Sequence, residues 1–195
     1  MKNPYKLALA VLAFGAFSCS SDDGGSGGSG SCESDIPFFQ TGKYAKYKMT
    51  QFGFDAGTMK LTFGECDGNG LASTMEIRDA AGTLQQTIPN TFWQDGAYLV
   101  GDANNDGIDY HKIYKKDAQL NDTWTETDED GAVIVHTVVD MDSLITVPAG
   151  SFHCKVYLRT KSDIINTSHI FWHDTEGQIM EDAEFFQMEL MENNN

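Results

Sequence analysis

The residues best placed to do chemistry lie in the segment 101–109, where oxygen-bearing side chains recur at alternate positions. Asp102, Asn104 and Asp106 occupy positions 1, 3 and 5 of a D-x-N-x-D-G loop. The glycine at position 6 permits the sharp turn that would bring them onto one calcium ion. At position 12, however, Ile113 replaces the bidentate glutamate of a full calcium loop. Two interpretations stay open: a calcium loop, or a polar hairpin turn built on the Asp-Gly pair.

The set of candidate calcium ligands extends beyond the glycine, because a later aspartate could compensate in part for the missing glutamate. The candidate ligands are Asp102, Asn104, Asp106, Ile108 and Asp109. Strands rather than helices are expected on both sides of this loop. A bound ion is therefore expected to stiffen a turn rather than to take part in catalysis, and no other cofactor is expected.

Histidine supplies the other candidate chemistry. His169 and His173 have H-x-x-x-H spacing, which on a helix would let both rings bind one zinc ion. The neighbouring Thr, Ser, Ile and Phe residues favour a strand, in which residues i and i+4 stand about 13 Å apart, too far for a shared ion. His111, His136 and His153 fall on other expected strands, with no nucleophile elbow beside them. We therefore expect a protein that is not an enzyme.

The N-terminal segment indicates where the protein goes. Lys2 and Lys6 precede a short apolar run that ends just before Cys19. A basic start, about a dozen apolar residues and a small-residue site are typical of a secretory signal, which is too short to span a bilayer. The sequence Ala-Phe-Ser-Cys resembles the bacterial lipobox. This resemblance implies that residues 1–18 are removed and that acylated Cys19 anchors the chain to a membrane.

Residues 19–31 are expected to form the lipidated cysteine and a flexible tether. The eight residues 24–31 are only Gly and Ser, with a span of roughly 15 Å. The acidic Ser-Ser-Asp-Asp at residues 20–23 resembles the export tag of surface lipoproteins in Bacteroidota, which implies the outer membrane and the cell surface. Aspartate after the cysteine also accompanies inner-membrane retention in other Gram-negative bacteria. The periplasmic leaflet therefore remains the alternative location.

The rest of the chain has the size and charge of one acidic domain. Residues 32–191 are enough for a single core, and the polar residues 192–195 are expected to be a disordered tail. The whole chain carries a formal charge of −16. Loss of the signal removes two lysines and no acid, which leaves about −18. This charge argues against nucleic acid as a partner, because no basic stripe is present to neutralise phosphates.

Three cysteines remain once Cys19 is acylated, so at most one disulfide can form within the chain, from three pairings. Cys154 alternates with two apolar neighbours in a strand-like run and is expected to face the core. Cys66 lies beside the turn at residues 67–70, and Cys32 lies at the end of the tether. We therefore favour a disulfide between Cys32 and Cys66.

The domain is predicted to consist of antiparallel strands and turns, all-β or nearly so. Short runs of aromatic and β-branched residues are separated by Gly and Asp, and no run of ten residues shows a helical period. Asp-Gly and Asn-Gly pairs supply the positive φ angles that two-residue hairpins need. The expected strands are 44–50, 58–63, 72–78, 97–100, 108–114, 132–139, 143–147, 151–158, 164–172 and 183–190.

One stretch carries a family resemblance. Residues 147–156, Val-Pro-Ala-Gly-Ser-Phe-His-Cys-Lys-Val, resemble the V-P-A-G-[ST]-F-x-x-x-[IV] strand of a family of Bacteroidota lipoproteins. Weaker matches lie at residues 37–47, at residues 120–124, and at Trp172 with Gly177. That family is similar to half-barrel carriers of the LolA/LolB type. The resemblance implies a strongly curved, lipid-anchored sheet and no catalytic site.

Two functions follow from these observations. The first is a non-enzymatic carrier that holds an apolar or lipid ligand in the concave face of the sheet, in a pocket lined by Met and Phe. The alternative is a surface interaction module that binds a glycan or a partner protein through exposed aromatic residues and has a filled core. The interior of the domain distinguishes the two.

Overall fold

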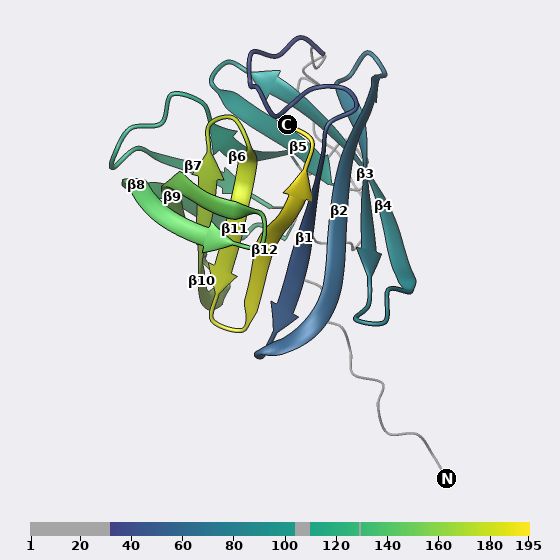
Figure 1. Ribbon diagram of the computed structural model, residues 1–195. Helices are drawn as coiled ribbons and strands as arrows, with labels where there is room; N and C mark the ends of the chain where they lie inside the picture. The colour runs from purple at the N-terminus through teal and green to yellow at the C-terminus, as the bar shows by residue number, and fades with distance from the viewer. Residues whose placement is uncertain (1–31, 104–109, 129) are drawn as a thin grey trace.

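The computed structural model describes residues 32–103, 110–128 and 130–195, which form twelve β-strands (Figure 1). The strands are β1 (Tyr44–Gln51), β2 (Phe54–Cys66), β3 (Leu71–Arg78), β4 (Leu84–Asp95), β5 (Tyr98–Ala103), β6 (Tyr110–Lys115), β7 (Thr123–Thr127), β8 (Val133–Val147), β9 (Gly150–Lys161), β10 (Ile164–His173), β11 (Gly177–Ala183) and β12 (Phe186–Asn193). None of the described residues belongs to a helix that could cross a membrane.

All twelve strands belong to one antiparallel sheet, in the order β6-β5-β4-β3-β2-β1-β12-β11-β10-β9-β8-β7. Neighbours in the sheet are neighbours in the chain, except that β1 pairs with β12. The two edge strands, β6 and β7, are therefore consecutive in the chain. Because the sheet curls round until these edges meet, it forms a nearly closed barrel (Figure 1). The prediction of an antiparallel, strongly curved all-β domain is confirmed.

Alternation of side chains explains why the clearest strands form where the sequence predicts them. In β3, Leu71, Ser73, Met75 and Ile77 are buried and the residues between them are less so. This is the period of two that places every second side chain on one face. The observed strand begins one residue before the predicted one.

Other strands differ from the prediction for identifiable reasons. No strand is predicted over β4, because residues 84–87 are exposed and mostly polar and Pro89 interrupts the pattern of the residues that follow. The short strand β7 and the strand β11 were also missed. The predicted strands 132–139 and 143–147 are one strand, β8, with irregular register around Asp140. The predicted strand 183–190 is broken by a turn at residues 184–185, which separates β11 from β12.

The core consists of two clusters of buried side chains. In one, the segment before β1 inserts Phe38 and Phe39 among aromatic residues from several strands. The ring centroid of Phe38 lies 5.1 Å from Tyr114 and 5.8 Å from Trp172. The second cluster contains buried methionines together with Leu190. Its methionines are Met49, Met75, Met180 and Met188.

The V-P-A-G stretch forms the hairpin between β8 and β9. Pro148 and Ala149 make the turn, and β9 starts at Gly150 with a φ of 142°. The N–H of Ala149 donates to the carbonyl of Leu190 at 3.0 Å. The tip of this hairpin therefore contacts β12, although three strands separate β8 from β12 in the sheet.

The expectation of a disordered tail over residues 192–195 is corrected. β12 continues through Asn193, and Asn194 accepts a hydrogen bond at Oδ1 from the N–H of Tyr44 at 2.7 Å. The side-chain amide of Asn195 donates to the carbonyl of Glu176 at 2.8 Å. Asparagine amides find backbone partners here because β12 lies between two strands rather than at an edge.

Candidate functional site

Three phenylalanines form an exposed group at one end of the domain, which we call the phenylalanine tip: Phe52, Phe54 and Phe185. Phe52 and Gly53 make the turn between β1 and β2, and Phe185 lies in the turn between β11 and β12. Both turns lie at the lower end of the view in Figure 1. The N–H of Phe52 donates to the carbonyl of Phe185 at 2.9 Å, and the two ring centroids are 5.2 Å apart. The two hairpins thus hold their rings together.

The tip is unusual in two respects: its aromatic side chains are exposed to solvent, and one of them lies in a left-handed backbone conformation. Phe52, Phe54 and Phe185 are 62%, 77% and 45% exposed. Phe52 also has a φ of +51° and Gly53 a φ of +78°. Two successive positive φ angles in a two-residue hairpin favour Asn-Gly, and a bulky residue in the left-handed region costs about 1–2 kcal/mol. The fold therefore holds an aromatic side chain in water at a position that disfavours it.

The charge around the tip is acidic. Asp55, Asp182 and Glu184 are exposed beside the rings. Residues 49–57 and 182–188, which form the two turns and their flanks, contain no Lys or Arg. An apolar patch with an acidic border would attract a basic rather than an acidic partner.

A second unusual region, the β6–β7 seam, closes the sheet without a backbone ladder. The indole N–H of Trp124 donates to the carbonyl of Lys112 at 2.9 Å. The backbone N–H of Lys112 donates to Oε2 of Glu126 at 2.7 Å. Both backbone polar groups of one β6 residue are thus satisfied by β7 side chains, which leaves neither group unpaired at the edge.

Glu126 also joins two histidines that are far apart in the chain. Its Oε1 lies 3.1 Å from Nε2 of His136 and 3.4 Å from Nδ1 of His111. Burial alone would raise the pKa of Glu126, but hydrogen bonds from His111, His136 and the Lys112 N–H outweigh it and lower the pKa to about 2. The ring of His136 stacks on Trp124 with centroids 5.0 Å apart.

The seam is therefore a set of contacts that satisfies both oxygens of Glu126, rather than an open reactive centre, while Nδ1 of His136 is buried without a hydrogen-bond partner in the described part of the chain. The side chains of His136 and Glu126 are 3% and 9% exposed. Because a carboxylate only accepts, both histidine nitrogens that face it act as donors. Across the described residues, no group of three or more His, Cys, Asp or Glu is arranged to hold a metal ion. The geometry supports a role in closing the barrel.

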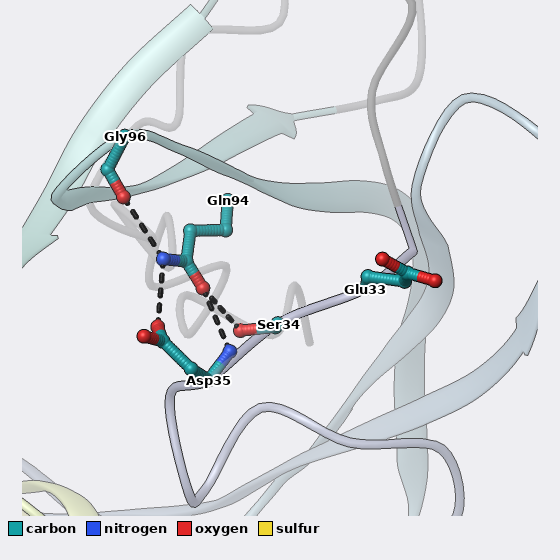
Figure 2. Close-up of a pocket in the computed structure, with 5 residues that line it drawn as sticks. All are labelled: Glu33, Ser34, Asp35, Gln94 and Gly96. Carbon is teal, nitrogen blue, oxygen red and sulfur yellow. Dashed lines mark hydrogen bonds between the residues drawn. The ribbon is translucent and has the colours of Figure 1, made fainter.

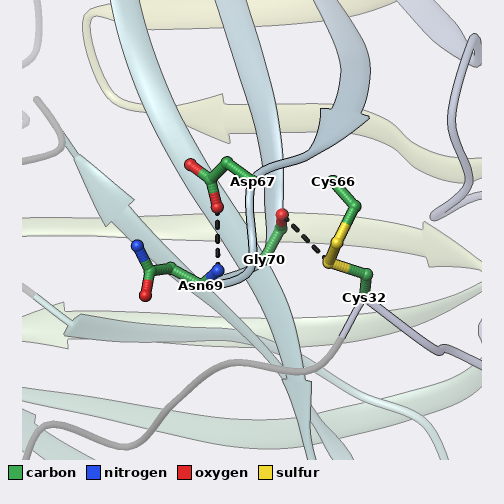
Figure 3. The surroundings of a disulfide bond; sticks show 5 residues. All are labelled: Cys32, Cys66, Asp67, Asn69 and Gly70. Carbon is green, nitrogen blue, oxygen red and sulfur yellow. Dashed lines mark hydrogen bonds between the residues drawn. A yellow bond between two sulfur atoms is a disulfide. The ribbon is translucent and has the colours of Figure 1, made fainter.

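The predicted disulfide is present: Cys32 and Cys66 are bonded, with their Cα atoms 5.7 Å apart (Figure 3). Sγ of Cys32 lies 3.2 Å from the carbonyl oxygen of Gly70, beside the β2–β3 turn. Closing a loop with a sequence separation of 34 stabilises the domain by about 3–4 kcal/mol in the chain-entropy account. Cys154 is buried and unpaired, as its strand pattern predicts.

A shallow depression of about 470 Å³ lies where the first described residues meet the β4–β5 turn (Figure 2). Its centre is the amide of Gln94. Oε1 of this side chain accepts from Ser34 Oγ at 2.7 Å and from the Asp35 N–H at 3.0 Å. Nε2 donates to Asp35 Oδ1 at 2.8 Å and to the Gly96 carbonyl at 2.9 Å. These bonds fix the first described residues against the β4–β5 turn.

Most of the calcium-loop residues predicted from the sequence, and the lipidation site, lie outside the described residues. Cys19, Asn104, Asp106, Ile108 and Asp109 are among them. Asp102 is described, and it is a buried residue of β5 opposite Thr91 and Tyr110. The calcium interpretation remains a prediction.

The other aromatic and histidine candidates are placed in the sheet. His169 and His173 both lie on β10, as the strand interpretation requires. Trp124 and Trp172 are buried in the core, so the three tryptophans form no common exposed platform. Sequence reasoning found no link between His111 and His136, because Glu126 joins them only in space. It also missed the tip, whose available signal was an aromatic residue directly before a turn glycine.

One of the comparisons with known proteins supports this architecture. No protein-family model matches the chain, and no curated protein matches it. A similar solved structure is a candidate exported protein with a YmcC-like fold from Bacteroides fragilis, 12% identical, with a TM-score of 0.58 over 80% of this chain and 97% of that chain. This chain shares that fold. Another is a candidate lipoprotein from Parabacteroides distasonis, 12% identical, with a TM-score of 0.45 over 83% of this chain and 100% of that chain.

Proposed function

We propose that this chain is a lipid-anchored, non-enzymatic protein of the bacterial envelope that acts as an interaction module. The observation that carries the proposal is the filled aromatic interior. The rings of Phe38, Tyr114, Tyr157 and Trp172 form one packed group, with centroid distances of 5.1–6.4 Å. Such contacts belong to a packed core rather than to an open pocket.

The carrier interpretation ranked first from the sequence is less well supported by this geometry. It requires methionine and phenylalanine side chains that line an accessible cavity. Instead, Met49, Met75, Met180 and Met188 are each less than 10% exposed and pack in one cluster. Phe38 and Phe39 are buried within the other. Apolar side chains available for contact lie on the outside of the domain, and the most exposed of them, Phe54 and Phe52 at 77% and 62%, belong to the phenylalanine tip.

Support for the anchor comes from the start of the chain. Cys19 follows a secretory-type signal, and the Gly/Ser residues give a tether that ends at Cys32. Cys32 is bonded to Cys66, so any pull on the tether is transmitted to β2. We propose the outer membrane and the cell surface as the location, on the strength of the acidic residues after Cys19.

Native mass spectrometry of residues 20–195 tests the proposal. This chain keeps the core, the disulfide and the tether and omits only the signal and the lipidation site. Purified from a bacterial host without detergent, it is expected to give the bare mass of the oxidised polypeptide. A stoichiometric adduct of several hundred daltons that is released by unfolding would contradict the interaction module and favour the carrier. Spraying with and without calcium tests the Asp102–Asp109 loop in the same experiment.

A further inference from the structure

The phenylalanine tip combines features that a solvent-facing turn does not need. Phe52 occupies a left-handed position where Asn or Gly is favoured, yet its ring is 62% exposed, and among the ring pairs of the described residues it contacts only the tilted ring of Phe185. Strained backbone that holds an unsuitable side chain is a recognised sign of function. Two exposed phenylalanines on adjoining turns, with a third at the first residue of β2, also exceed the scattered single apolar residues of an ordinary surface.

The tip also points away from the tether. Phe54 begins β2 and Cys66 ends it, and the thirteen residues of this strand cover roughly 40 Å. The disulfide to Cys32 therefore fixes the tether at the opposite end of β2 from the tip, as Figure 1 shows for the strand. The Gly, Ser and Asp composition of residues 20–31 predicts a reach of only about 20 Å on average. The rings thus face away from the bilayer that would hold Cys19.

The charge around the rings limits the kind of partner that can bind the tip. Asp55, Asp182 and Glu184 border the tip, and no cationic side chain lies in either turn. Anionic lipid headgroups would be repelled by this border. A protein surface that combines an apolar pocket with Lys or Arg at its rim would be complementary in both respects.

We propose that the phenylalanine tip is the docking surface of this chain for a protein partner whose binding site is an apolar pocket bordered by Lys or Arg side chains. This inference rests on the proposed function and adds the place and the chemistry of the contact. Phe54, the most exposed ring, enters the pocket, and Phe185 supports Phe52 beside it.

Photo-crosslinking of the full chain in the bacterium that produces it tests the proposal. The probe is p-benzoylphenylalanine, placed at position 54 in one strain and at position 144 in another. Leu144 is 61% exposed on β8 and serves as a matched apolar control. We expect a protein adduct from position 54 and none from position 144. Mapping of the adduct is expected to place the crosslink in a partner segment that contains apolar residues next to Lys or Arg.

A Phe52→Asn change separates docking from folding. Asn suits the left-handed turn position, so the variant is expected to melt at the wild-type temperature or about 1–2 °C above it. It removes one ring of the tip and is expected to lower the yield of the adduct about tenfold, the size of a moderate hot-spot loss. The control Leu144→Asn is expected to leave the yield unchanged.

Four results would overturn the docking proposal: no protein adduct from position 54, equal adducts from both positions, a yield that Phe52→Asn leaves unchanged, or a mapped partner segment without cationic residues. Binding of the tip to phosphatidylcholine vesicles, lost in Phe52→Asn, would also overturn it in favour of a lipid surface. These failures are separate from failure of the proposed function. If native mass spectrometry gives the bare mass but position 54 gives no crosslink, the chain is an interaction module that uses another surface. If native mass spectrometry gives a ligand adduct, the proposed function itself is wrong.

Discussion

The seam and the tip depart from the ordinary rules of a β domain in opposite directions. At the seam, a largely buried carboxylate on β7 is satisfied by hydrogen bonds from a backbone N–H and a histidine of β6 and from a histidine of β8. At the tip, it exposes three phenylalanines and strains one of them. Each region lacks what the other has: the seam has partners but little exposure, and the tip has exposure but few partners.

This difference indicates what each region is for. A buried charge that loses its partners is costly, so the saturated contacts of Glu126 are what a stabilising closure requires. An exposed aromatic ring contributes little to folding, so its retention in a strained turn calls for a reason outside the fold. Substitutions at the two sites should therefore separate stability from binding.

The largest effect is expected from Glu126→Ala. The change leaves the Lys112 N–H and two histidine N–H groups without their acceptor in a buried site, so the free energy of unfolding should fall by about 3–5 kcal/mol. Urea unfolding monitored by tryptophan fluorescence measures this loss. Glu192→Ala removes a carboxylate that is 55% exposed and is expected to cost less than about 0.5 kcal/mol. Equal losses in the two variants would remove the distinction between seam and surface.

The seam should also make stability depend on pH. The pKa of Glu126 is about 2 in the folded protein against an ordinary 4.5, so its contribution is fully present above about pH 5 and is lost as the pH falls toward 2. The contribution is about 3 kcal/mol. Unfolding of wild type and Glu126→Gln at pH 7, 4 and 3 isolates it, because other carboxylates titrate alike in both chains. The difference in the free energy of unfolding between wild type and Glu126→Gln should shrink from pH 7 to pH 3. A difference that stays constant with pH would contradict the low pKa of Glu126.

Trp124→Phe should have a smaller effect at the same seam. The variant keeps an aromatic ring beside His136 but removes the N–H that satisfies the Lys112 carbonyl, at a cost of about 1–3 kcal/mol. Thermal unfolding measures the change. Trp93→Phe, the same substitution at a half-buried position on β4, should cost less. If Trp93→Phe proves the more costly, the indole bond does not help to close the barrel.

How much the sequence could reveal depended on whether a feature was local. The alternation in β3 predicted that strand to within a residue, and the turn beside Cys66 led to the correct disulfide. The first half of β4 shows no alternation of apolar and polar residues because its side chains are exposed. Pro89 interrupts the pattern of the second half, so the sequence does not indicate a strand there either.

The two unusual regions were hidden for different reasons. The seam depends on which strands become the edges of a closed sheet, and no short-range pattern reports that a β6 backbone group will meet Glu126. At the tip, Phe185 reads as part of a strand because its turn lacks Gly and Asn. Phe52-Gly53 lacks the Asn or Asp that marks most two-residue hairpins.

The most direct test of the account is urea unfolding of Phe52→Asn. Relief of the left-handed strain should raise the free energy of unfolding by about 1 kcal/mol. Loss of the exposed ring contact with Phe185 should offset about half of that gain. The account predicts a midpoint equal to that of the wild type or slightly above it, with an unchanged slope. A midpoint well below that of the wild type would show that Phe52 is retained to stabilise the fold, and would contradict the claim that the tip is held for contact with a partner.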